Sequence, residues 1–272
     1  MIESHISRLI IAMSLFFGSF VLPAHAQECG RDGSGFRAWI ESFKERGRKQ
    51  GLTDATLKLL DGVSYSSRVI ALDRNQKSFK LSFGEFYARR VNDSLIRRGR
   101  ALWAENRPLF DAVEERFGVP APVIIAIWGL ETNYGKLSGN LDILTSLATL
   151  SYDCRRSTFF EPNLVGALMI IQRGDMPRAK MRGAWAGEIG QTQFMPANYI
   201  KYGMDADGDG RSDLVSSIPD VIASTANFLK GHGWKGREWG PGTANYEVIR
   251  QWNRAAVYVQ TIAIMADKIA AP

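Results

Sequence analysis

The sequence predicts a mainly α-helical fold with little β structure. Apolar residues recur at helical spacing through most of the chain, and glycine or proline separates the helical patterns. The 272 residues include 45% apolar residues, which is enough for one large core or two small ones. No internal repeat, low-complexity tract or clear linker follows Gln27. We therefore expect a single domain over residues 27–272.

In the N-terminal part of the chain, helices are predicted over residues 36–50, 55–60, 78–90 and 93–117. The first pattern ends at Gly51, and Gly62 stops the second. Thr53 or Asp54 can cap the second helix, because either side chain offers an oxygen to the amides of the first turn.

Farther along the chain, helices are predicted from Pro122 to about Gly135 and over residues 141–150, 161–173, 218–230 and 247–269. The break Gly118-Val119-Pro120 precedes the first of these, and a proline suits the first turn of a helix because its missing N–H is not needed there. Gly135 is the expected stop of that helix.

Glu131 is the first candidate for chemistry, because it closes the almost unbroken apolar run Ile124 to Leu130. Burial disfavours the charged form of a carboxylate and raises its pKa, so such a group can carry a proton at neutral pH and donate it. That property is what a general acid needs. An ordinary helix glutamate that points to solvent is the alternative.

The segment from Gly183 to Pro196 is the second candidate, because it combines glycines, glutamines and aromatic residues with no clean period. Glycine lets a backbone approach a ligand closely, and amides both donate to and accept from sugar hydroxyl groups. The segment therefore suggests a polar groove for carbohydrate, with a tight loop closing a helix pair as the alternative. The adjacent Arg155 and Arg156 can clamp carboxylates or lie on a solvated surface.

A cation loop is indicated between residues 205 and 213, which match the first nine positions of an EF-hand loop. Ser216 stands at the twelfth position, where a bidentate glutamate is usual, and Asp220 is the candidate replacement. A weak calcium site and a metal-free turn both fit. The candidate ligands are Asp205, Asp207, Asp209, Arg211 through its carbonyl, Asp213 and Asp220.

The N-terminus has the pattern of an export signal. Arg8 precedes the apolar run Leu9 to Leu22, and Ala24-His25-Ala26 is the small-x-small pattern that signal peptidase cuts. We expect residues 1–26 to be a signal peptide. The apolar run is short for a membrane span, so the mature protein is expected to be soluble and periplasmic or secreted.

Two cysteines are present, Cys29 and Cys154, and an oxidising compartment favours a disulfide between them over two free thiols. Gln27 and Glu28 separate Cys29 from the small residues of a lipoprotein cleavage site, so a lipid anchor is not expected. His232 is the single histidine outside the expected signal peptide, which excludes a histidine-based zinc site.

The formal net charge of +6 favours an anionic partner. Lysine and arginine are spread along the chain rather than gathered in one tract, so nucleic acid is not indicated. An anionic polymer such as the bacterial cell wall fits the expected location, as does a merely soluble basic protein. No serine, histidine and aspartate set occurs in a recognisable context.

Taken together, these segments resemble the lytic murein transglycosylases of the membrane-bound lytic transglycosylase B type. The matching motifs are Gly118-Val119-Pro120, Ala126 to Thr132, Leu147 to Leu150, Cys154-Arg155-Arg156, Ala186 to Pro196, the aspartate loop, Ala223 to Asn227 and Trp252-Asn253. The match extends from about Cys29 to near the C-terminus. It implies a lysozyme-like core over about residues 105–235, flanked by helices over about 34–104 and 244–271.

The resemblance implies cleavage of the β-1,4 bond between N-acetylmuramic acid and N-acetylglucosamine without water, which leaves a 1,6-anhydromuramyl end. Glu131 matches the family's sole catalytic acid and base. The substrate-binding residues implied are Arg155, Arg156, Gln193, Phe194, Phe228, Trp252, Asn253 and Tyr258. The family often has serine at Ala184 and tyrosine at Phe228 and Trp252, so some of its hydrogen bonds to sugar are in doubt here.

No cofactor is required on this interpretation, and calcium would be structural. The expected partner is the glycan strand of peptidoglycan, with other cell-wall enzymes as further candidates, and the protein is expected to be a monomer. A muramidase that lets water attack in the same cleft is the alternative within the enzyme class. A non-catalytic wall-binding protein is the alternative outside it, although a binder has no need of a protonated acid.

Overall fold

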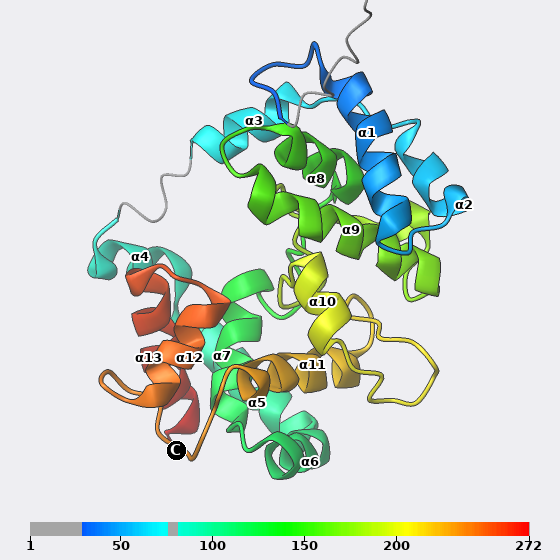
Figure 1. Ribbon diagram of the computed structural model, residues 1–272. Coiled ribbons are helices and arrows are strands. Elements are labelled where there is room, and N and C mark those ends of the chain that lie inside the picture. The colour runs from blue at the N-terminus through cyan, green and yellow to red at the C-terminus, as the bar shows by residue number, and fades with distance from the viewer. Residues whose placement is uncertain (1–28, 76–80, 272) are drawn as a thin grey trace, which may run out of the picture.

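The computed structural model describes residues 29–75 and 81–271 and confirms the mainly α class (Figure 1). The predicted signal peptide lies outside the described residues. The helices are α1 (Phe36–Lys49), α2 (Asp54–Leu57), α3 (Ser67–Arg74), α4 (Phe83–Arg90), α5 (Asp93–Glu105), α6 (Arg107–Phe117), α7 (Ala121–Thr132), α8 (Ile143–Tyr152), α9 (Ser157–Arg173), α10 (Pro196–Tyr202), α11 (Ile218–Gly231), α12 (Ala244–Trp252) and α13 (Ala256–Ala270).

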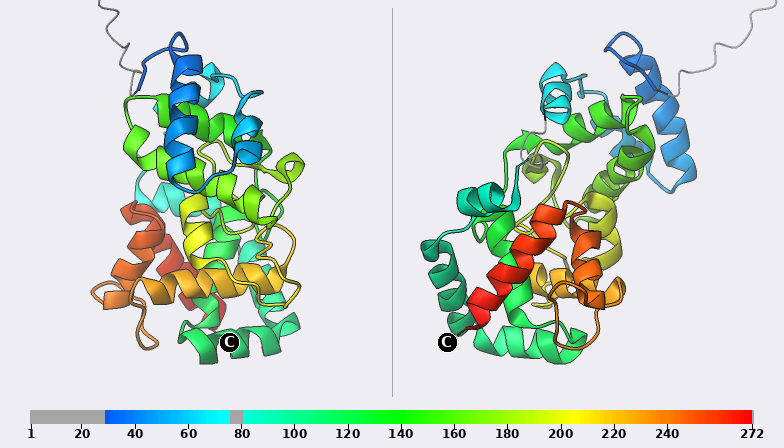
Figure 2. Two further views of the ribbon diagram at one scale, coloured as in Figure 1. Left: turned by 45° about the vertical axis from the view of Figure 1, so that its right-hand side comes forward. Right: turned by 90° about the vertical axis from the view of Figure 1, so that its left-hand side faces the viewer.

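The helices form two groups that α10 connects (Figures 1 and 2). In one group α8 and α9 pack together, with α1 and α3 against α8 and α2 against α9. In the other group α13 packs on α7, α5 and α4, and α11 packs on α6. Strands β1 (Leu141–Asp142) and β2 (Arg182–Gly183) pair antiparallel, so β structure is minor, as predicted.

Helix α7 is the buried centre of the second group. Every residue from Ala121 to Leu130 is buried, which is the expected fate of a helix that is apolar on all sides. The predicted stop at Gly135 is late, because the helix ends at Thr132 and Asn133 takes the left-handed conformation with φ 52°. Asparagine tolerates this conformation better than most residues, so it can take the place of glycine after a helix.

Several other predicted boundaries differ from the structure. Helix α9 begins at Ser157 rather than near residue 161, and Pro162 lies inside it. Residues 93–117 divide at Asn106 into α5 and α6, and α3 was not predicted at all. The predicted helix over 247–269 is two helices, α12 and α13. This last division matters most, because it determines which side chains reach α7.

The disulfide between Cys29 and Cys154 is present, as predicted, and joins residues 125 positions apart. Beside it the amide of Gly30 donates to the carbonyl of Tyr152 at 2.8 Å, and the amide of Cys154 donates to the carbonyl of Gly30 at 3.1 Å. The bond therefore ties the start of the described chain to the end of α8. Among the described residues, no helix has the length and apolar character needed to cross a bilayer.

Candidate active site

Glu131 lies in the last turn of α7, where α12 and α13 meet that helix. Its Oε1 atom accepts a hydrogen bond from the Tyr258 hydroxyl at 2.6 Å and a second from the Trp252 indole nitrogen at 3.1 Å. No donor from the described part of the chain reaches Oε2. One carboxyl oxygen is thus held by the protein, and the other is available to a substrate.

The surroundings raise the pKa of Glu131 to about 7, mainly because burial disfavours the carboxylate. The hydrogen bonds from Tyr258 and Trp252 and the charge of Arg90 act in the opposite direction, and the charge of Glu188 adds to the increase. A carboxyl group with a pKa near neutrality can give up a proton and take one back under the same conditions. Glu131 is therefore suited to act as both acid and base.

The turn between α12 and α13 positions both donors. The Asn253 side-chain oxygen accepts a hydrogen bond from the Ala255 amide at 3.0 Å, which stabilises this turn. Trp252 stands before the turn and Tyr258 after it, so the turn brings them to the same carboxyl oxygen. Asn253, predicted to contact substrate, is thus bonded to its own turn.

Two aromatic rings pack against the ring of Trp252. The ring of Phe194 meets that of Trp252 edge-on at 5.0 Å, and the ring of Phe228 does so at 4.8 Å. Phe194 and Phe228 are each only 2% exposed, so they do not form a sugar-binding surface as the sequence suggested. This corrects their predicted role, since edge-to-face contacts of buried rings fix the position of Trp252 instead.

The loop from Gly183 to Pro196 closes against the end of α7. The Gln193 side-chain nitrogen donates to the Ser138 carbonyl at 3.2 Å and to the Gly190 carbonyl at 2.9 Å. Gln191, which was not among the predicted site residues, accepts from the Trp128 indole at 2.9 Å and donates to the Val215 carbonyl at 2.9 Å. Gln191 therefore joins α7 to the end of the aspartate loop, while Gln193 joins two loops.

Backbone strain is concentrated around Glu131. Among the described residues, the non-glycine positions with positive φ are Asn133 at 52°, Tyr134 at 57° and Gln193 at 57°. Two of them directly follow the last turn of α7, and the third lies in the loop packed against it. Left-handed conformations of this kind are costly outside glycine and tend to persist at functional sites, which agrees with the position of Glu131.

Arg155 and Arg156 belong to an ion-pair cluster rather than standing free. Both guanidinium groups pair with the carboxylate of Asp73, which is 3% exposed and comes from α3. Arg74 pairs with Asp73 at 3.1 Å and with Asp153 at 2.8 Å. We call these five residues the paired arginine cluster. The arginine side chains remain 36–42% exposed, so they can still meet a ligand.

A second group of cations, which the sequence did not predict, lines a cavity of about 570 Å³ that also contains Glu131. Arg89 and Arg90 end α4, Arg98 lies in α5, and Lys136 follows α7. Because these residues come from three separate segments, no single stretch of sequence shows them together. We call this cavity the basic pocket.

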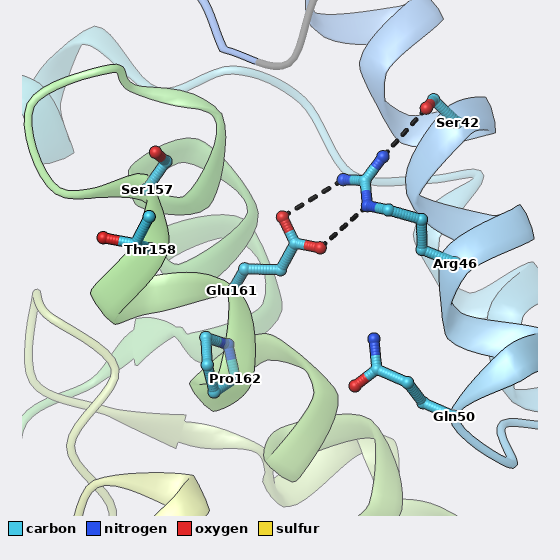
Figure 3. Close-up of a pocket in the computed structure, with 7 residues that line it drawn as sticks. All are labelled: Ser42, Arg46, Gln50, Ser157, Thr158, Glu161 and Pro162. Carbon is cyan, nitrogen blue, oxygen red and sulfur yellow. Dashed lines mark hydrogen bonds and ion pairs between the residues drawn. The ribbon is translucent and has the colours of Figure 1, made fainter.

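Another cavity, of about 580 Å³, lies between α1 and α9, away from Glu131 (Figure 3). Arg46 crosses it and meets Glu161 through two hydrogen bonds of 2.8 and 3.1 Å, while a third reaches the Ser42 hydroxyl at 2.8 Å. The positive charge of Arg46 in this cavity is therefore balanced by Glu161.

The aspartate loop brings three of its predicted ligands together. Carboxylate oxygens of Asp205, Asp207 and Asp209 all lie within 4.8 Å of one another. Asp220 is buried, and its two oxygens accept from the amides of Ala206 and Asp213, each at 2.7 Å. Asp220 thus bonds to both ends of the loop, and neither Asp213 nor Asp220 belongs to the group of three.

Comparisons with known proteins relate this chain to transglycosylases. The family model described as Transglycosylase SLT domain matches residues 35–243. The Membrane-bound lytic murein transglycosylase B of Escherichia coli is 34% identical over 140 residues, or 51% of this chain, and the match spans only 38% of that protein's length.

Solved structures give the same result for the fold. SltB3 of Pseudomonas aeruginosa in complex with NAG-NAM-pentapeptide has a TM-score of 0.80 and 28% identity, covering 87% of this chain and 80% of its own. The lytic transglycosylase Slt35 of Escherichia coli in complex with calcium has a TM-score of 0.73 and 22% identity over 92% of this chain and 98% of its own, which supports the fold alone. The predicted lysozyme-like, mainly α class is confirmed.

Proposed function

Because this chain belongs to the Transglycosylase SLT domain family, we propose that it is a lytic transglycosylase of peptidoglycan. It cleaves the β-1,4 bond between N-acetylmuramic acid and N-acetylglucosamine without water and leaves a 1,6-anhydromuramyl end. The observation that supports this proposal best is Glu131, a carboxyl group with a pKa of about 7, one oxygen bonded to two donors and the other open.

Glu131 acts twice in the proposed reaction. Its proton passes to the glycosidic oxygen as the bond from that oxygen to the anomeric carbon of the muramyl residue breaks. The resulting carboxylate, stabilised by the hydrogen bonds from Tyr258 and Trp252, then accepts the proton of the C6 hydroxyl group of the same sugar. That hydroxyl oxygen bonds to the anomeric carbon, the acetamido group assists, and Glu131 is protonated again.

A muramidase is the second candidate, because another acid, the half-buried Glu188, lies near enough to raise the pKa of Glu131. Two-carboxylate glycosidases need one of the pair ionised, as nucleophile or as base for water. Burial raises the pKa of Glu188 as well, and its side chain accepts from the Ala186 amide at 3.1 Å. Burial disfavours the ionised form of Glu188 that a hydrolase would need, which favours the transglycosylase over the hydrolase.

Analysis of the products decides between these reactions. Purified peptidoglycan would be digested with the protein and its soluble fragments measured by mass spectrometry. The proposal predicts anhydromuramyl ends, each lighter by one water than a reducing end. Reducing muramyl ends would establish a hydrolase, and undigested glycan that still binds the protein would establish a wall-binding protein.

Substrate contacts are proposed at the open side of the site. Trp252 and Tyr258 border the acid, Gln193 borders the sugar groove, and Arg155 and Arg156 remain exposed enough to meet carboxylates. We further propose that residues 1–26 direct the chain to the periplasm, and that residues 27–272 form one catalytic domain that acts as a monomer. Glycan strands are its partner, with other wall enzymes as further candidates.

Calcium is proposed as a structural ion of the aspartate loop. Carboxylate oxygens suit a hard cation, and Asp205, Asp207 and Asp209 supply three of them within reach of one ion, with the Arg211 carbonyl as a further ligand. Ser216 gives no bidentate carboxylate, so a low affinity is expected. The melting temperature should be higher in calcium than in chelator, and equal values would remove the proposal.

A further inference from the structure

The basic pocket has more positive charge than the protein itself matches. Glu131 is the one acidic side chain that lines it within the described part of the chain, and this acid is half neutral at pH 7. Over the same residues, none of the ion pairs involves Arg89, Arg90, Arg98 or Lys136. Glu85 of α4 acts on Arg89 from outside the pocket, so the four cations still meet too few acids, and such a site favours an anion.

Two of the four cations are held in place by the protein. Arg90 donates to the Leu130 carbonyl at 2.6 Å, directly before the catalytic glutamate. The guanidinium of Arg98 lies 5.4 Å from the centre of the Tyr134 ring, a cation–π contact. Arg89 and Lys136 are exposed, and no hydrogen bond or ion pair within the described part of the chain holds either of them. The pocket thus has two cations in contact with the protein and two without such contacts.

The substrate limits which anion can bind here, and this step rests on the proposed function. Hydroxyl and acetamido groups of the glycan are neutral and do not need cations. Once a peptide is attached, the lactyl group of a muramyl residue is an amide and is also neutral. The peptide itself carries several free carboxylates, which guanidinium and ammonium groups bind well.

We propose that the basic pocket binds the carboxylates of the peptide carried by a muramyl residue next to the bond that Glu131 cleaves. Leu137, which also lines the pocket, is 70% exposed and offers an apolar contact to the side chains of such a peptide. The enzyme therefore prefers strands that carry peptides over strands from which peptides have been removed. The basic pocket determines this specificity, while Glu131 performs the chemistry.

The test compares two substrates on the full chain. One is a set of glycan chains with their peptides, and the other is the same set after an amidase has removed them, which leaves one lactyl carboxylate on each muramyl residue. The variant is Arg89→Gln/Lys136→Gln, which removes the two charges that the protein does not bond and keeps Arg90 and its hydrogen bond beside Glu131. Arg97→Gln is the matched control, because this neighbouring residue of α5 does not line the pocket.

For the wild type we expect a KM about tenfold lower on peptide-bearing chains, given the strength of charge-assisted hydrogen bonds to carboxylates. The double variant should lose most of this preference through a higher KM with kcat little changed, and Arg97→Gln should retain it. Added salt should weaken the preference in the wild type.

Each other outcome overturns the inference. A rise in KM confined to the peptide-free chains would assign the pocket to the lactyl carboxylate instead of the peptide, because only these chains carry that carboxylate. A wild type without preference, or a double variant that keeps it, would show that the pocket binds no substrate anion. If the wild type forms no anhydromuramyl ends from either substrate, the proposed function has failed, and this result is separate from any change in preference.

Discussion

The protein holds two clusters of cations that differ in how their charge is matched. In the paired arginine cluster, Asp73 and Asp153 neutralise most of the charge of three arginines. In the basic pocket, four cations face one acid, and burial keeps that acid largely protonated up to neutral pH. The paired arginines are therefore partly neutralised within the chain, whereas the cations of the basic pocket are not.

The comparison explains why composition alone is a poor guide to binding. Arg155 and Arg156 are adjacent in sequence and suggested a clamp, yet both bond to Asp73 of α3. Arg89 and Lys136 are far apart in sequence and suggested nothing, yet they line one cavity with Glu131. The positions of the neighbouring acids determine what a cluster of cations can do.

The largest effect should come from Glu131, the acid of the basic pocket. Replacing it by glutamine removes the transferable proton, and we expect turnover of peptidoglycan to fall on the order of 10³-fold, the range measured for general acids. Glycan binding should persist, because the pocket keeps its cations and loses its acid. Glu188→Gln is the matched control and should change turnover by less than about threefold. Undiminished turnover in the Glu131→Gln variant would show that Glu131 is not the catalytic acid.

The disulfide beside the paired arginine cluster should have the next effect. Replacing Cys29 and Cys154 by serine releases a loop of 125 residues, and the loss of this constraint should lower the free energy of unfolding by about 4 kcal/mol. Urea denaturation of the variant and of the wild type measures it. Equal midpoints would mean that contacts around Gly30 hold the chain without the bond.

Breaking the paired arginine cluster itself should have a smaller effect. Asp73→Asn removes the carboxylate from three arginines, and we expect a loss of about 2 kcal/mol, the range for charge-assisted hydrogen bonds. The variant Arg89→Gln/Lys136→Gln, which removes unmatched charge, should change stability by less than about 0.5 kcal/mol. A loss of stability in the second variant as large as in the first would mean that the two clusters do not differ as described.

The smallest effect concerns the pKa of Glu131. Activity needs its protonated form, so kcat/KM should fall as pH rises through about 7. The Tyr258 hydrogen bond favours the carboxylate, so Tyr258→Phe should raise the pKa and move this fall to higher pH by less than about one unit. Profiles of kcat/KM against pH for both proteins measure the change. A fall that moves to lower pH would reverse the assigned effect of Tyr258.

The raised pKa of Glu131 also makes the stability of the folded protein depend on pH. The pKa of Glu131 in the folded protein, about 7, lies above its ordinary value of 4.5, so the folded state binds the extra proton between these values. The contribution is fully present below about pH 4.5 and is lost as pH rises through about 7. Glu131→Gln should therefore flatten the dependence of stability on pH across this window, as thermal melts in a series of buffers would show.

Much of the fold could be predicted because burial leaves a strong pattern in sequence. The run before Glu131 is apolar at every position, and α7 is buried on all sides. The helical pattern over 247–269 hid the turn at Asn253, because that turn depends on one side-chain bond to Ala255 rather than on glycine or proline. Helix α3 was also missed, because only two of its eight residues, Val69 and Asp73, are buried, and Asp73 is the acid that matches the arginines.

The site could be predicted only in part. Glu131 stands out locally, whereas Trp252 and Tyr258 were identified through family resemblance, since their bonds to Glu131 span 121 and 127 residues. Sequence motifs also do not distinguish contact with substrate from support of a neighbour. For that reason Phe194 and Phe228 were expected on the surface of the groove and are instead buried behind Trp252.

The distance along the chain between Glu131 and its two donors has a consequence for biosynthesis. A nascent chain that extends only to the end of α11 already contains the acid, but neither Trp252 nor Tyr258 has yet been made. The covering helix α13 is also missing at that stage, so α7 still faces water on that side. The acid therefore acquires its raised pKa of about 7 only once the last segment of the chain has been made.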